Sequence, residues 1–172
     1  MMKLKVKDIT LIAMMAAVIE VSKLVLAQIP NVELITFWVM MFSLYFGKRV
    51  YYVIIIFILL EGIVYGPQLW WIMYLYAWPL LAFLTMRLKD TSTLNMSIVS
   101  CVFGLLFGFL CSFPYFFIGL PSGIVEGFTT AFTWWIAGIP WDMVHGIANF
   151  MIMFILHKPI KNVMDRYKYI SG

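Results

Sequence analysis

Charged side chains are scarce in this chain. Asp, Glu, Lys and Arg together make up 12% of its 172 residues, against about 25% in an ordinary soluble domain. Hydrophobic residues make up 64%, and the mean hydropathy is +0.97. This balance excludes an ordinary soluble fold. The sequence therefore predicts an all-α integral membrane protein that forms one domain over residues 1–172.

Histidine and cysteine are also rare, with two of each. A zinc site needs at least three ligands, and only His145 lies inside an apolar run, because His157 stands near the C-terminal basic residues. Cys101 and Cys111, on one predicted helix, would lie about 15 Å apart along its axis, too far for a disulfide. The chain also has no P-loop and no GxSxG motif. We expect no metal, no cofactor and no enzymatic activity.

The positive charges are confined to short clusters. Eleven of the twelve Lys and Arg residues fall at positions 3–7, 48–49, 87–89 and 158–168. Each apolar stretch between them is long enough for two crossings, since one membrane helix needs ~20 residues. Lys and Arg stay on the cytoplasmic side of a membrane, so the pattern predicts six spans with both termini in the cytoplasm. The net charge of +4 is then an orientation signal with a weak attraction to anionic lipid, and we expect no nucleic-acid partner.

Helix breakers set the limits of the predicted six-transmembrane-helix bundle. The six spans are residues 8–28, 33–46, 50–65, 69–86, 94–118 and 140–156. Residues 119–139 contain several glycines and an aromatic patch, and we expect them to lie outside the membrane, on the bundle or folded into it. A seventh span there would place the C-terminal basic cluster outside. Gly104 and Gly108 form a GxxxG spacing, which lets a neighbouring helix approach closely.

Polar residues inside the predicted spans are the candidates for function. A charged group in a span costs at least ~2.5–3.5 kcal/mol on insertion scales and usually marks function. Given the predicted topology, all of them fall in the outer half of the membrane. They are Glu20, Lys23, Glu61, Asp142, His145 and Asn149. The asymmetry predicts a binding site that opens to the outside above a closed apolar floor, and not a pore.

Spacing groups these residues further. Asp142, His145 and Asn149 stand at i, i+3 and i+7 and share one helix face, while Glu20 and Lys23 are neighbours that can neutralise each other. Structural roles are also open: an ion pair for Glu20 and Lys23, hydrogen bonds between helices for the face of the last span, and a contact between the first and third spans for Glu61. Glu33 is expected at the water interface.

Five segments together resemble a known family. They read LIAMMAAVIEV, IPNVELITFWVMMFSLYFGKRV, LLEGIVYG, WWIMYLYAWP and, most specifically, GIPWDMVHGIANF. In this combination the chain resembles, over nearly its whole length, a substrate-binding S component of an energy-coupling factor (ECF) transporter. The resemblance implies capture of a vitamin or related micronutrient in an outward-facing pocket. It also implies a membrane coupling (T) subunit and two ATPase subunits as partners, in a prokaryotic plasma membrane.

The resemblance assigns roles to two regions. Small alanines of the first span, here Ala13 and Ala17, are expected to dock against the coupling subunit, although Val21 replaces a third alanine. The pocket of the family lies on the outer side and is built by the loop after the first span and by later helices. We expect residues 30–33 and 119–139 to close over it as lids. We expect Asp142, His145 and Asn149 to hold the substrate by hydrogen bonds, with Glu61, Glu20 and Lys23 as further candidates. The aromatic candidates for stacking on a substrate ring are Trp70, Trp71 and Tyr74.

Other classes fit the sequence less well. A self-sufficient small secondary transporter is the alternative, but it would often show pseudo-symmetric halves, and none is apparent. An intramembrane enzyme would need a nucleophile with its base or a second set of metal ligands. A purely structural subunit would leave the outer polar groups without a purpose. The ligand stays open between a polar heterocycle and a corrinoid.

Overall fold

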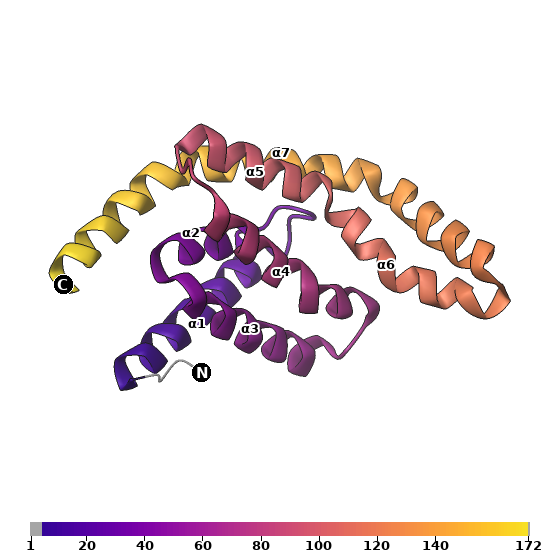
Figure 1. Ribbon diagram of the computed structural model, residues 1–172, viewed down its shortest axis with the longest axis horizontal. Helices are drawn as coiled ribbons and strands as arrows, with labels where there is room; N and C mark the ends of the chain where they lie inside the picture. The colour runs from indigo at the N-terminus through magenta and orange to yellow at the C-terminus, as the bar shows by residue number, and fades with distance from the viewer. Residues whose placement is uncertain (1–4, 172) are drawn as a thin grey trace.

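The chain is built of helices and short turns. The computed structural model describes the backbone of residues 5–171 and the side chains of residues 5–166. Its elements, shown in Figure 1, are α1 (Val6–Leu26), α2 (Ile35–Phe46), η1 (Gly47–Arg49), α3 (Val50–Tyr65), α4 (Leu69–Arg87), α5 (Thr93–Leu105), α6 (Phe107–Gly119), η2 (Leu120–Ser122) and α7 (Ile124–Ser171). Because η1 links α2 directly to α3 and a single residue separates α5 from α6, these elements form five helical stretches along the chain. The predicted all-α class is confirmed.

Four of these stretches are long and apolar enough to cross a membrane: Val6–Leu26, Leu69–Arg87, Thr93–Ser122 and Ile124–Arg166. By length and composition the chain is therefore a multi-pass membrane protein. The prediction of six spans is wrong, because α2 has 12 residues and α3 has 16. At 1.5 Å per residue they reach about 18 and 24 Å, less than the ~30 Å of a hydrocarbon core. Between them the chain reverses at Gly47, whose φ of 54° favours glycine.

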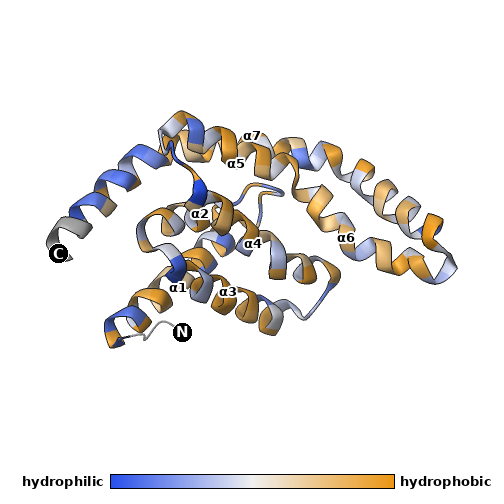
Figure 2. Ribbon diagram, in the orientation of Figure 1, coloured by the Kyte–Doolittle hydropathy of each residue, from blue (hydrophilic) through white to orange (hydrophobic). Residues whose placement is uncertain are grey.

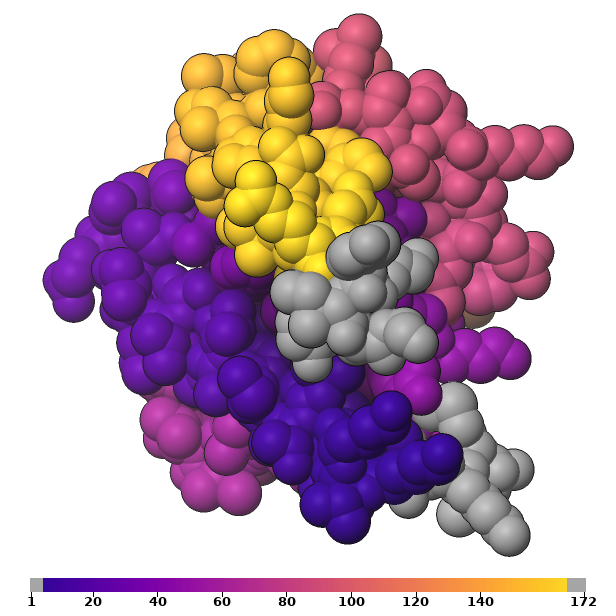
Figure 3. All heavy atoms as spheres, turned by 90° about the vertical axis from the view of Figure 1, so that its left-hand side faces the viewer, coloured from indigo at the N-terminus to yellow at the C-terminus, as the bar shows by residue number. Residues whose placement is uncertain are grey.

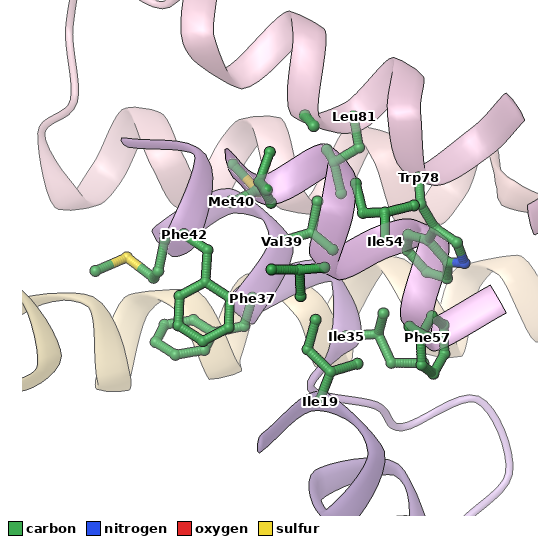
Figure 4. Close-up of a cluster of buried hydrophobic side chains, with 14 of the residues drawn as sticks. Ile19, Ile35, Phe37, Val39, Met40, Phe42, Ile54, Phe57, Trp78 and Leu81 are labelled. Atoms are coloured by element: carbon green, nitrogen blue, oxygen red, sulfur yellow. The ribbon is translucent and has the colours of Figure 1, made fainter. Parts of the chain in front are cut away.

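Helix α2 is a core helix. An apolar helix of 10–14 residues is more often buried in protein than exposed to lipid. Eight of its twelve residues are buried, and Val39 and Met40 have no exposed surface. Figure 4 shows side chains from α1, α3 and α4 packed around it, with Ile19, Ile54 and Trp78 among them. The hydrophobic core of the molecule therefore lies within α1–α4.

Residues 119–139 also differ from the prediction. They form η2 and the beginning of α7, a helix of 48 residues that continues through Pro140. A helix of that length spans about 72 Å, so α6 and the first part of α7 form a hairpin that extends beyond α1–α4 (Figure 1). The hairpin is tight, since a Cβ on Gly119 would lie 2.5 Å from the Glu126 carbonyl oxygen. The predicted helix start at Pro140 is wrong because packing against α6 carries the helix through the proline.

Both ends of the described chain lie at one end of the molecule. The start of α1 and the end of α7 are both on the left-hand side of Figure 1. Figure 3, which shows the molecule from that side, has them together on the face toward the viewer. Figure 2 places hydrophilic segments there, including the turn after α2 and the connection between α4 and α5. Arg49 Nε lies 3.0 Å from Asp8 Oδ1, and the Tyr45 hydroxyl donates to Asp165 at 2.9 Å. The described basic clusters thus gather at one end, which we call the basic end.

Candidate functional site

A cavity of about 470 Å³ lies between the α1–α2 loop and the α6–α7 hairpin. This volume is in the range of small-molecule sites, about 300–1,000 Å³. Both segments that the sequence predicted as lids contribute to its wall. The lining residues are Pro30, Asn31, Phe107, Gly108, Cys111, Trp134, Ala137, Gly138, Trp141 and Asp142. Pro30 and Asn31 follow the last turn of α1, so the cavity lies at that end of α1, away from the basic end.

Asp142 is the charged group of this cavity. Asp142 is 7% exposed, and its Oδ1 accepts a hydrogen bond from the backbone N–H of Gly108 at 2.9 Å. The second oxygen, Oδ2, is buried and has no hydrogen-bond partner among the described residues. A Cβ on Gly108 would overlap the carboxylate, so glycine is required there. A buried acceptor without a partner costs about 1–3 kcal/mol, and a ligand donor would remove that cost.

His145 and Asn149 share the predicted face with Asp142 but contact the start of α2. His145 Nε2 lies 3.1 Å from Glu33 Oε1, and the Asn149 amide donates to the Thr36 hydroxyl at 3.3 Å. The imidazole also packs edge to face on Phe107, at 4.7 Å between ring centroids. These contacts place the two side chains as supports that join α7 to α2, beside Asp142.

Glu33, which the sequence predicts at the water interface, lies in the loop just before α2 and is partly buried. Its carboxylate is 16% exposed, and it accepts the Thr36 N–H at 2.9 Å and the Thr36 hydroxyl. Burial alone would raise the pKa of Glu33, but the hydrogen bonds from His145 and Thr36 outweigh it and lower that pKa. The sequence signal was an acidic residue just before an apolar helix, where it can satisfy an unpaired N–H of the first turn.

The other charged candidates form a separate cluster between α1 and α3. Lys23 forms an ion pair with Glu61, which has no exposed surface, and does not pair with Glu20 as the sequence suggested. Its ammonium also lies 4.4 Å from the ring centroid of Tyr65 and 5.4 Å from that of Trp70. Glu20 Oε2 and Glu61 Oε1 are buried without hydrogen-bond partners among the described residues. The cluster fits the structural alternative, in which Glu61 holds α3 against α1.

The predicted aromatic candidates do not line the cavity. The Trp71 indole donates to the Ile58 carbonyl at 2.8 Å and faces an apolar groove between α3 and α4. Trp70 and Tyr74 belong to a row of rings that continues to Trp78 and Phe107, with centroids 5.2, 5.4 and 5.5 Å apart. This row connects the Lys23 cluster with the cavity wall.

The rings that do line the cavity come from later in the chain. They are Phe107, Trp134 and Trp141, and Trp134 is held by stacking on Tyr115 at 4.4 Å. Sequence reasoning missed Trp134 because residues 119–139 were expected outside the helices, and it did not separate Phe107 and Trp141 from the other aromatic residues of the predicted spans. The aromatic patch in that segment was the available signal.

The predicted docking residues lie on an exposed face of α1. Ala13 and Ala17 are exposed on α1, and Val21 on the same face is 58% exposed.

Within the described residues no group of three His, Cys, Asp or Glu side chains could hold a metal ion. Comparison of the chain with protein-family models, curated proteins and solved structures finds no match.

Proposed function

We propose that this chain is the substrate-capture (S) subunit of an ECF-type importer in a prokaryotic plasma membrane. It binds a vitamin or related micronutrient and works with a membrane coupling (T) subunit and two ATPase subunits. One observation carries the proposal: Asp142 lines the cavity away from the basic end, and its buried carboxylate oxygen Oδ2 has no hydrogen-bond partner among the described residues.

The chemistry of the cavity suits capture of a small molecule. Such sites are mostly apolar, with a few polar groups that fix the orientation of the ligand. Here aromatic rings form the walls and Asp142 supplies the polar group. The Glu33–His145 pair joins the α1–α2 loop to α7, and so fixes the distance between two walls of the cavity.

Tight packing below the cavity argues against an open path through the chain. A Cβ on Gly104 would lie 2.8 Å from the Gly146 Cα, so α5 and α7 are in backbone contact there. Beside this contact, the α1–α4 core is filled by apolar side chains. A protein that holds a ligand above such a floor needs a partner to bring it across, which favours a capture subunit over a self-sufficient secondary transporter.

The face of α1 suits such a partner. Small residues at a membrane interface let two helices approach closely, and Ala13 and Ala17 are exposed one turn apart. Met14 and Val18, beside them, line an apolar groove of about 300 Å³ between α1, α2 and α7. We assign this face to the coupling subunit.

The test is purification of the tagged chain from its native membrane, with and without a bulky residue on α1. Wild type is expected to retain the coupling subunit and both ATPases, and to carry a small molecule that mass spectrometry identifies. Ala17→Trp should lose the partners and uptake but keep the small molecule. Leu59→Trp, at a residue of α3 that is 57% exposed, is the matched control and should keep all three. ATPase-independent uptake by the chain alone in proteoliposomes would establish the secondary transporter instead.

A further inference from the structure

The cavity has an unbalanced charge. Of the described residues that line it, Asp142 is the charged one, and no Lys or Arg is among them. The nearest basic side chain, His145, is engaged by Glu33 at 3.1 Å. A carboxylate in an apolar site attracts a cation or a strong hydrogen-bond donor, and it repels an anion.

The two oxygens of Asp142 differ in what they need. Oδ1 already accepts the Gly108 N–H at 2.9 Å, whereas Oδ2 has no partner among the described residues. A cationic ligand beside Asp142 favours the ionised form of its carboxyl group, and an ionised carboxylate only accepts hydrogen bonds. The complementary ligand atom is therefore an N–H or O–H donor, and a cationic nitrogen makes the shortest and strongest bond of this kind.

The walls select for shape. Phe107 and Trp134 both line the cavity, and neighbouring rings hold each of them in place. Trp141, next to Asp142 in the chain, adds a third aromatic side chain. Aromatic faces stack on flat rings and attract cations, with Trp the strongest. A volume of about 470 Å³ suits one or two fused rings and is too small for a corrinoid.

We infer that the cavity binds a flat heteroaromatic molecule that directs a cationic or donor nitrogen at Asp142 Oδ2. The inference rests on the proposed function only in taking this cavity as the substrate site. It narrows the substrate to nitrogen-rich, cationic ring compounds and excludes anionic ones.

Two probes of similar shape and opposite charge test the inference. Calorimetric titration of the purified full chain, freed of retained small molecules, would use 4-aminoquinoline as the cationic donor and quinoline-4-carboxylate as the anion. The amine is expected to bind and the carboxylate to bind at least tenfold more weakly. Equal or tighter binding of the carboxylate, or no binding of the amine, would overturn the inference. This arm uses wild type alone and does not depend on how a variant folds.

The second arm removes the charge and keeps the shape. Asp142→Asn should weaken binding of 4-aminoquinoline at least tenfold, while Asp90→Asn, the same exchange at the basic end, should leave it unchanged. Unchanged affinity in a folded Asp142→Asn protein would overturn the inference. If the chain imports an anionic nutrient together with the ATPases, the inferred ligand class is wrong but the proposed importer function stands. If the chain binds the amine but recruits no ATPase, the inferred ligand class stands but the proposed importer function is wrong.

Discussion

The two halves of the molecule hold their helices together by different means. In α1–α4 large apolar side chains interlock around α2, and this half supplies most of the buried hydrophobic residues. In α5–α7 the described residues contribute four to that set: Met96, Phe103, Cys111 and Met153. Those helices meet instead through glycines, with Gly104 against Gly146. A side-chain core fills space, whereas a backbone contact leaves space beside it, and the cavity lies where the second half meets the first.

Buried charge shows the same contrast. In α1–α4 the Glu61 carboxylate has its counter-charge within the chain, in Lys23. At the junction with α7, the Gly108 N–H is the one hydrogen-bond partner of the Asp142 carboxylate among the described residues. In our proposal the paired charge holds two helices together, and the carboxylate with one free oxygen binds a ligand. Three substitutions test this division, one in each half and one between them.

Lys23→Met should have the largest effect. The substitution removes the counter-charge of Glu61, which stays buried next to a second carboxylate, that of Glu20. Breaking a buried ion pair typically costs about 3–5 kcal/mol. Because the Lys23 side chain is 22% exposed, we expect about 3 kcal/mol, seen as a lower melting temperature in detergent. Lys158→Met, at an exposed lysine of the basic end, is the control.

The double variant Lys23→Met with Glu61→Gln separates charge from packing. It should recover part of the stability, since the uncompensated carboxylate is gone. If it melts no higher than Lys23→Met alone, the ion pair does not hold α1 against α3.

The sequence predicted those features that depend on local pattern. Charge clustering predicted that the described basic segments share one end, and the spacing of Asp142 and His145 predicted their common face. What it could not supply depends on distant contacts. The partner of Lys23 is 38 residues away, while Glu20 stood one turn away. Helix α2 was taken for a span because apolar composition does not distinguish lipid from a protein core.

The same limit explains residues 119–139. Their four glycines and Pro121 are ordinarily loop signals, and the sequence alone does not indicate what they pack against. In the structure two of those glycines lie where α6 and α7 pack closely: a Cβ on Gly119 would lie 2.5 Å from the Glu126 carbonyl oxygen, and a Cβ on Gly127 would lie 2.9 Å from the Phe116 ring. Glycines that the sequence pattern indicates as helix breakers therefore serve as packing residues in the hairpin. The hairpin also brings Trp134 to the cavity.

Gly104→Ala should have an intermediate effect in the second half. The added methyl group would lie 2.8 Å from the Gly146 Cα, and backbone cannot rotate away as a side chain can. Overpacking of this kind costs about 1–3 kcal/mol, and we expect about 2 kcal/mol by thermal melting.

Gly138→Ala is the matched control within α7, because nothing lies within 4 Å of its Cβ position. Alanine is the better helix former by about 0.5–1 kcal/mol, so this variant should melt slightly higher than wild type. If both variants shift in the same direction, helix propensity decides the outcome and close backbone contact does not.

Tyr76→Phe should have the smallest effect and tests the junction between the halves. Pro114 of α6 has no N–H, so the Leu110 carbonyl lacks its helical donor, and the Tyr76 hydroxyl of α4 donates to that carbonyl at 2.6 Å. Loss of this hydrogen bond should cost about 1 kcal/mol. A double-mutant cycle with Pro114→Ala shows whether the proline is the reason. Alanine restores the helical donor, so Tyr76→Phe should cost clearly less in that background. An equal loss in both backgrounds would mean that the tyrosine stabilises the junction by ring packing on Phe113, and that the hydroxyl is incidental.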